Sequence, residues 1–125
     1  MDERTITRFV ACGWIAAAAA GVLTIVLIAL GPLTKLSLLD AAFLLGLAYG
    51  IRRGSRICAV LALVYHIANR ALVYAHIPHV SAGIVAGDMV FATLYVLGVI
   101  GTFAAHSRIA RADSAAPVRA GDRSA

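Results

Sequence analysis

Charged residues are scarce in this 125-residue chain, where Asp, Glu, Lys and Arg make up 14% of the sequence against about a quarter in soluble domains. Aromatic residues account for only 7%, and there are three prolines and two cysteines. Cys12 and Cys58 form no Cys-x-x-Cys motif, which argues against a disulfide framework and against a cysteine metal site. Apolar residues reach 62%, and this excess indicates a lipid bilayer rather than water as the solvent.

The motifs of common catalytic centres are also missing. The sequence contains no His-Glu-x-x-His zinc motif, no Gly-x-Ser-x-Gly nucleophile turn and no glycine-rich phosphate loop. The net charge of +5 does not indicate nucleic acid, because the basic residues gather at the ends of apolar runs rather than on one soluble face. We therefore expect no enzymatic activity, no cofactor and no nucleic-acid partner.

Four apolar runs fill most of the chain, and each predicts a transmembrane helix. Barrel strands are an unsuitable alternative, since they span about ten residues and alternate in polarity. Pro32 and Pro78 follow the first and third runs, where proline cannot continue helical hydrogen bonding. Residues 107–125 are rich in Ala, Arg, Ser and Asp and predict a disordered basic cytoplasmic tail. The four predicted helices, which form one domain over residues 1–106, cover 9–30, 35–51, 57–77 and 82–105.

The basic residues are distributed unequally over the predicted loops. Nine arginines lie before the first run, between the second and third runs, and after the fourth, whereas the other two loops hold only Lys35. Because basic loops stay in the cytoplasm, both termini are predicted to be cytoplasmic. The expected fold is all-α, an integral membrane four-helix bundle with antiparallel up-down topology. The nine residues are Arg4, Arg8, Arg52, Arg53, Arg56, Arg108, Arg111, Arg119 and Arg123.

Small residues recur at four-residue spacing in three of the runs. Such residues share one helix face and let backbones approach closely in lipid. We expect these faces to pack inside the four-helix bundle, or one of them to form a homodimer contact. The residues are Gly13, Ala17 and Gly21 in the first run, Gly46 and Gly50 in the second, and Gly83 and Gly87 in the fourth.

A polar cluster interrupts the predicted spans, where each charge costs about 2.5–3.5 kcal/mol. It consists of Asp40, His66, Asn69, Arg70 and Asp88. Counting outward from the turns places Asp40 level with His66, and Arg70 level with Asp88. His66 and Arg70 are four residues apart and share a helix face. We expect Arg70 to pair with Asp88, and Asp40 to lie against His66 or Arg70.

This polar cluster has more than one interpretation. It is an ion-pair network that fixes helix register, or it is a proton or cation site in which an aspartate or His66 titrates during transport. Binding of a substrate or a lipid is a further alternative. Complete internal pairing favours the ion-pair network.

His76 and His79 flank Pro78 in the loop between the third and fourth runs. They are weak candidates for zinc or copper ligands, because no carboxylate accompanies them and zinc sites use at least three protein ligands. We therefore predict no metal site.

One segment resembles a group of small bacterial four-helix membrane proteins with no known activity. It covers residues 38–70, with the sequence LLDAAFLLGLAYGIRRGSRICAVLALVYHIANR. The shared features are an Asp-led helix that ends in Gly-x-x-x-Gly-Ile, a Ser-Arg turn, and a helix with a central Tyr. Residues 101–106, Gly-Thr-Phe-Ala-Ala-His, are similar to the Gly-Thr-Phe-x-x-His ending of their fourth helix. Here Ala and Arg stand where members have more aromatics and lysines. The resemblance implies the four-helix fold and a multi-pass location in a bacterial inner (plasma) membrane.

Two functions of different classes follow from these observations. The first is a structural or accessory subunit that acts through helix packing, as a homo-oligomer or in a larger membrane complex. The second is a small proton-coupled transporter that works as a dimer, because four helices alone enclose little volume. The clustered arginines also predict contact with anionic headgroups of the lipid bilayer, at about 1 kcal/mol per basic residue near the surface.

Overall fold

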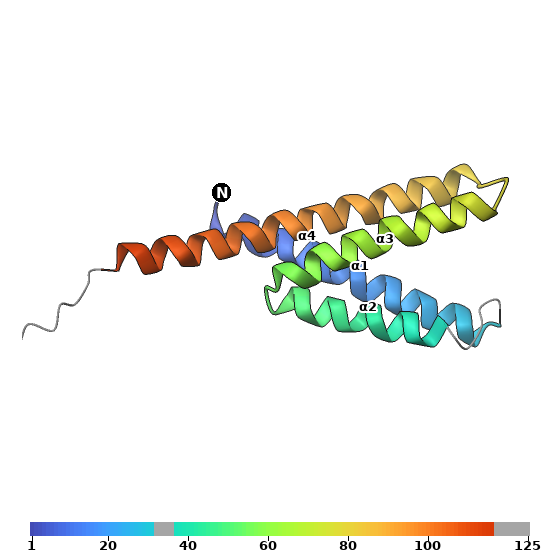
Figure 1. Cartoon of the computed structure of the whole chain (residues 1–125), viewed down its shortest axis with the longest axis horizontal. Coiled ribbons are helices and arrows are strands. Elements are labelled where there is room, and N and C mark those ends of the chain that lie inside the picture. Colours follow the sequence, from blue (N-terminus) through green and yellow to red (C-terminus); the bar gives the residue numbers. More distant parts are fainter. Residues whose placement is uncertain (32–36, 117–125) are drawn as a thin grey trace, which may run out of the picture.

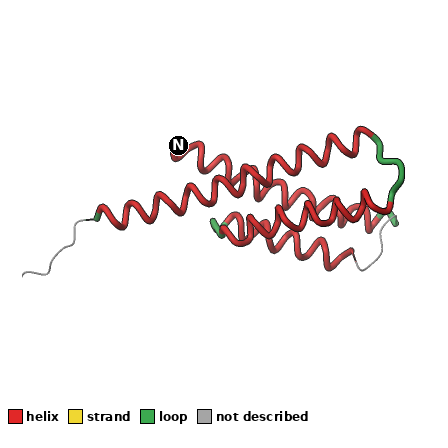
Figure 2. The backbone as a smooth tube through the Cα atoms, turned by 45° about the horizontal axis from the view of Figure 1, so that its top comes forward, coloured by secondary structure: helices red, strands yellow, loops and turns green. Residues whose placement is uncertain are grey.

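The computed structural model describes residues 1–31 and 37–116, and this part of the chain folds into four α-helices (Figure 1). The tube in Figure 2 shows that the described residues form helices and short loops, with no strand among them. The prediction of an all-helical chain with four helices is confirmed. The helices are α1 (Glu3–Ala29), α2 (Ser37–Arg52), α3 (Arg56–His76) and α4 (Ala82–Ala115).

Three of these helices, α1, α3 and α4, are long and apolar enough to cross a membrane. The fourth, α2, has 16 residues. At 1.5 Å per residue its length is about 24 Å, short of the roughly 30 Å hydrocarbon core. Its predicted start at Lys35 lies outside the described residues.

The surface of the described helices is largely apolar. Leu23, Ile57, Leu72 and Met89 are 53%, 73%, 63% and 66% exposed, and many other large apolar side chains are exposed beside them. Soluble monomers rarely expose contiguous apolar areas beyond a few hundred Å². This surface fits a protein that lies in a membrane.

A glycine turn joins α2 to α3. Gly54 has a φ of 80°, in the left-handed region that glycine enters without steric cost. Its N–H donates to the carbonyl of Ile51 at 2.8 Å, and the N–H of Ser55 donates to the carbonyl of Gly50 at 3.0 Å, which closes the end of α2. The Ser55 hydroxyl accepts a bond from the N–H of Cys58 and caps the start of α3. The sequence Gly-Ser-Arg therefore ends one helix and begins the next.

The helices form two pairs that meet at one end and separate at the other. Helix α1 packs extensively against α2 and α4, and α3 contacts both α4 and α2. In Figure 1 the pairs α1–α2 and α3–α4 are closest near the α2–α3 turn and diverge toward the loop at residues 77–81. The separation leaves space between the pairs at the end opposite the turn.

The end of the molecule near the α2–α3 turn, where the helix pairs are closest, is the closed end. There α1 and α4 meet through glycines. A Cβ atom built on Gly13 would lie 2.6 Å from the Cα of Gly98. One built on Gly101 would lie 2.7 Å from the backbone nitrogen of Val10. Gly98 and Gly101 were not among the residues that four-residue spacing singled out, because they are three residues apart.

Several of the predicted packing residues lie at helix contacts. Ala17 is fully buried, and a Cβ atom on Gly21 would lie 2.9 Å from the side chain of Leu45 on α2. Gly50 lies directly against the side chain of Cys58, where α2 passes α3.

Three other predicted packing residues, Gly46, Gly83 and Gly87, lie on exposed helix faces. A Cβ atom built on any of them would have no described atom within 4 Å beyond its own stretch of helix. The expectation that they pack inside the bundle is therefore corrected: small residues permit close approach only on a face that meets a neighbour, and these faces point away from the other helices. The homodimer contact stays a prediction.

Helix α4 continues to Ala115 instead of ending at residue 105, and its last turns extend beyond the other helices (Figure 1). The predicted disorder is therefore corrected for residues 107–115, which are helical although their side chains are exposed. Ala and Arg are strong helix formers, and the first proline after the apolar run is Pro117. The Arg108 guanidinium also donates a hydrogen bond to the Met1 carbonyl. The remaining part of the predicted tail, 117–125, lies outside the described residues.

Candidate functional site

A cavity of about 360 Å³ lies between the two helix pairs, and all four helices contribute to its wall. Ligand sites usually measure about 300–1,000 Å³, so this cavity is at the small end of that range. Four of the five residues of the predicted polar cluster line it, and Asp88 does not. The polar residues of the wall are Thr24 of α1, Ser37 and Asp40 of α2, Tyr65, His66, Asn69 and Arg70 of α3, and Tyr95 of α4.

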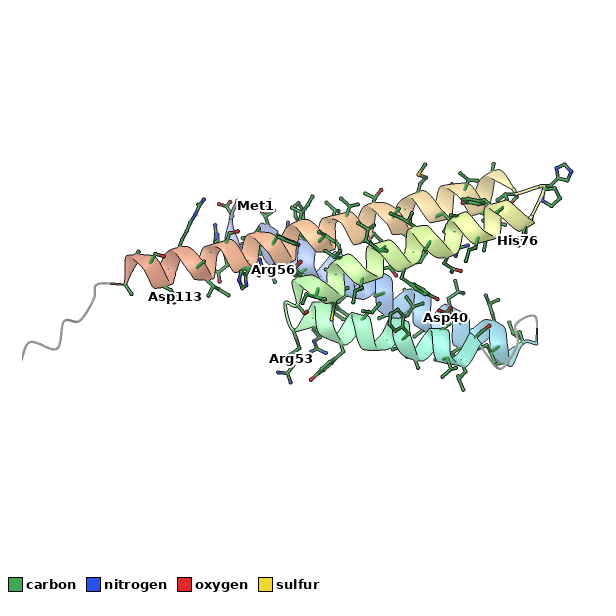
Figure 3. All side chains as sticks on the ribbon, in the orientation of Figure 1. Met1, Asp40, Arg53, Arg56, His76 and Asp113 are labelled. Carbon is green, nitrogen blue, oxygen red and sulfur yellow. The ribbon has the colours of Figure 1, made fainter. Side chains whose placement is uncertain are left out.

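Asp40 is the acidic residue of the cavity wall. It belongs to the first turn of α2, and Figure 3 labels it where the helix pairs have separated. The positive end of the helix dipole favours a negative charge there by about 0.3–1 kcal/mol. Among the described residues, no basic nitrogen lies within 4.0 Å of its carboxylate. The predicted contact with His66 or Arg70 is therefore corrected: Asp40 and these two residues line the same cavity without an ion pair between them.

Arg70 pairs with Asp88 of α4, as predicted by counting residues outward from the turns. Its Nε atom lies 3.0 Å from Oδ1 of Asp88, although the N–H is not aligned for a hydrogen bond. The hydroxyl of Tyr74 donates to the other carboxylate oxygen of Asp88. Asp88 lines a separate hollow on the outer surface of α3 and α4. Arg70 therefore lies between this hollow and the cavity, and Asp88 balances its charge on the side of the hollow.

Tyr95 joins the cavity to the packed core. Its side chain is only 1% exposed, and its hydroxyl has no hydrogen-bond partner among the described residues. A buried hydroxyl without a partner costs about 1–3 kcal/mol. Such a group at a cavity wall marks a position where a water or a ligand would complete the hydrogen bonding.

Aromatic rings surround the polar groups of the wall. The rings of His66 and Tyr95 are 5.2 Å apart between centroids, and those of His66 and Phe91 are 6.3 Å apart. Tyr65 packs edge-on against Phe43 of α2, with 5.2 Å between centroids. Aromatic residues therefore contribute to the cavity wall beside the polar ones.

Thr24, Tyr74 and Tyr95 were not singled out from the sequence. For Tyr74 and Tyr95 the spacing of polar residues along the helix does contain a signal. Tyr74 follows Arg70 by four residues and shares its face of α3, and Tyr95 follows Asp88 by seven and lies near its side of α4. Thr24 has no such signal in the spacing. In the structure its hydroxyl donates a hydrogen bond to the Ala20 carbonyl of its own helix at 2.9 Å.

The two loop histidines lie outside this cavity. His76 and His79 are both exposed, and Figure 3 places His76 near the end of α3. The Nδ1 atom of His76 is 2.8 Å from the Leu72 carbonyl of its own helix. Within the parts of the chain that the structure describes, no three His, Cys, Asp or Glu side chains gather as metal ligands.

Arginines at the closed end of the molecule lie over aromatic rings. Each pair places a guanidinium within about 6 Å of a ring centroid, the range of cation–π interaction. Basic and aromatic side chains together are typical of a membrane interface. Arg52 lies over Trp14 at 5.5 Å, Arg53 over Tyr49 at 5.3 Å, and Arg56 over Phe103 at 5.3 Å.

Comparisons with protein-family models, with curated proteins and with solved structures find no match to this chain. What the site does is therefore inferred from its own residues. With His66 neutral, Asp40 carries the one charge at the cavity that lacks a balancing partner among the described residues, because Arg70 and Asp88 balance each other. A cavity with one excess negative charge attracts a proton or a cation.

Proposed function

We propose that this chain is a small transporter of the bacterial inner membrane that takes a solute into the cavity between its helix pairs. The observation that carries the proposal is the cavity itself, bounded by all four helices and lined by Asp40 and by Tyr95, whose hydroxyl has no partner in the part of the chain that the structure describes. Ionisable groups in a membrane domain are costly and commonly mark substrate or ion pathways. The ion-pair network alone does not account for the cluster, because Arg70 and Asp88 pair without Asp40.

In this proposal the helices run up and down through the membrane with antiparallel neighbours. The N terminus, the α2–α3 turn and the C terminus lie in the cytoplasm, which the arginine distribution supports. The arginine–aromatic pairs at the same end support it as well. The cavity then opens toward the outside, near the loop at residues 77–81. The bacterial location rests on the family resemblance.

Transport requires that the cavity also open toward the cytoplasm. That side is closed by the contacts of α1 with α4 around Gly13 and Gly98. Rocking of one helix pair against the other, as in larger transporters, would open it. Exchange of a proton on Asp40 would couple this motion to the proton gradient. A single chain already encloses the cavity, so a second copy is not needed to form the binding site.

Cysteine labelling in intact cells tests the orientation and the cavity together. The background is a chain with Cys12→Ala and Cys58→Ala, to which Asn69→Cys is added in the cavity wall. A membrane-impermeant maleimide should label this cysteine from outside. The matched control is Val64→Cys on the same helix, which is 55% exposed but faces lipid in this proposal and should stay unlabelled. An unlabelled Asn69→Cys, or equal labelling of both, would contradict the proposal.

A structural or accessory role is the second candidate, and the exposed glycines favour it. Gly83 and Gly87 leave one face of α4 open to the backbone of another helix. Native mass spectrometry of protein released from nanodiscs distinguishes the two roles. A homodimer or larger complex that is lost in the Gly83→Leu, Gly87→Leu double variant would support the accessory role. A monomer in the wild type would contradict it.

A further inference from the structure

The charges that face the cavity come from two of its four helices. Helix α1 presents no titratable side chain and α4 presents only Tyr95, whereas α2 presents Asp40. Helix α3 presents Tyr65, His66 and Arg70. The carboxylate of Asp40 is therefore the only negative group that a solute in the cavity would meet along the described wall.

Among the described residues of the wall, an anionic solute would find no positive partner that lacks a balancing charge. Arg70 lines the cavity, but its Nε atom lies 3.0 Å from Asp88, which balances its charge. An anion would also be repelled by Asp40. The described part of the wall therefore favours a positive solute over a negative one.

The rest of the wall favours an organic cation over a metal ion. Calcium takes six or more oxygen ligands and magnesium an octahedral set, and Asp40 is the only carboxylate of the wall. The wall contains instead the aromatic residues Tyr65, Phe91 and Tyr95, and aromatic rings attract ammonium groups. A cavity of about 360 Å³ holds a small molecule rather than a large amphiphile.

We infer, resting on the proposed transport function, that the solute is a small organic ammonium ion held by the carboxylate of Asp40 between aromatic rings. The buried hydroxyl of Tyr95 supplies a hydrogen bond to a polar group on the same solute. Asp40 contributes the charge, and Tyr95 contributes orientation at the inner end of the cavity.

A series of three probes of nearly equal shape tests the charge requirement. Choline is positive, 3,3-dimethyl-1-butanol is its neutral carbon analogue, and 3,3-dimethylbutanoate is negative. Isothermal titration of the full-length protein in nanodiscs should show choline binding at least about tenfold tighter than either analogue, the loss expected when a charge-assisted contact is removed. Tighter binding of the anion would overturn the inference and move the site to Arg70.

Two variants assign the binding to Asp40. Asp40→Asn should weaken choline binding at least about tenfold, while it costs the protein no more than about 1 kcal/mol of stability. Asp113→Asn removes a carboxylate from the exposed end of α4, labelled in Figure 3, and should bind choline as the wild type does. Wild-type affinity in Asp40→Asn would overturn the inference. Absence of choline binding in a protein whose Asn69→Cys variant is labelled from outside would reject the ammonium class and leave the transporter proposal standing.

Discussion

Gly13 of α1 and Gly98 of α4 meet backbone to backbone, since a Cβ atom on Gly13 would lie 2.6 Å from the Cα of Gly98. The same two helices contribute Thr24 and Tyr95 to the cavity wall farther along. Helices α1 and α4 therefore take part both in the closed end and in the cavity wall. Any change that forces the glycines apart should disturb both.

Gly98→Ala should destabilise the protein, because the added methyl group must displace backbone rather than a flexible side chain. The expected loss is about 1–3 kcal/mol, as for overpacking in a dense core. Gly87→Ala on the same helix is the control, since open space surrounds that position and alanine favours helix by up to about 1 kcal/mol. Thermal unfolding in detergent compares the two variants. Equal unfolding temperatures of the two variants would show that the backbones of α1 and α4 are not in close contact at Gly98.

Arg70 and Asp88 should behave as a coupled pair. Arg70→Gln and Asp88→Asn should each lower the free energy of unfolding by about 1–3 kcal/mol, because each leaves a charge without its partner. The estimate is below the value for fully buried pairs, since the Arg70 side chain is 35% exposed. The double variant should recover most of the loss. Additive losses in a double-mutant cycle would contradict direct pairing.

Asp40→Asn should change stability far less than Asp88→Asn. Among the described residues Asp40 has no ion-pair partner, so the substitution removes only its interaction with the helix dipole, about 0.3–1 kcal/mol. Unfolding of the two variants under identical detergent conditions provides the comparison. A loss at Asp40 as large as at Asp88 would mean that Asp40 is part of the structural network.

Tyr95→Phe should separate stability from binding. The variant removes a buried hydroxyl that lacks a partner, so the empty protein should be as stable as the wild type or more stable, by up to about 1–3 kcal/mol. Choline binding should weaken, because the solute loses a hydrogen bond. Thermal unfolding with and without choline measures both effects. A variant that is less stable without choline would show that the hydroxyl already has a partner.

The number of helices and the Arg70–Asp88 contact were predictable because both follow from one-dimensional rules. Long apolar runs specify spans, and counting outward from the turns specifies which residues share a depth. The end of α4 was not predictable from hydropathy, because residues 107–115 remain helical after the apolar run ends.

Lateral relationships between helices were the part that the sequence did not specify. Depth alone placed Asp40 level with His66, but it gave no measure of how far the helix pairs diverge. Four-residue spacing likewise identified Gly46, Gly83 and Gly87, which face outward, and missed Gly98, which meets the backbone of Gly13. Both errors have one physical origin: in lipid the apolar faces of a helix look alike, so the sequence does not reveal which face meets a neighbour.

Uptake of radiolabelled choline into proteoliposomes tests the central claim most directly. Vesicles would contain purified wild-type protein, the Asp40→Asn variant or no protein, with a proton gradient imposed across the membrane. The transporter account predicts saturable uptake by the wild type, competition by unlabelled choline but not by 3,3-dimethyl-1-butanol, and loss of uptake in Asp40→Asn. Wild-type uptake equal to that of protein-free vesicles, in protein that binds choline in nanodiscs, would contradict transport and favour an accessory role.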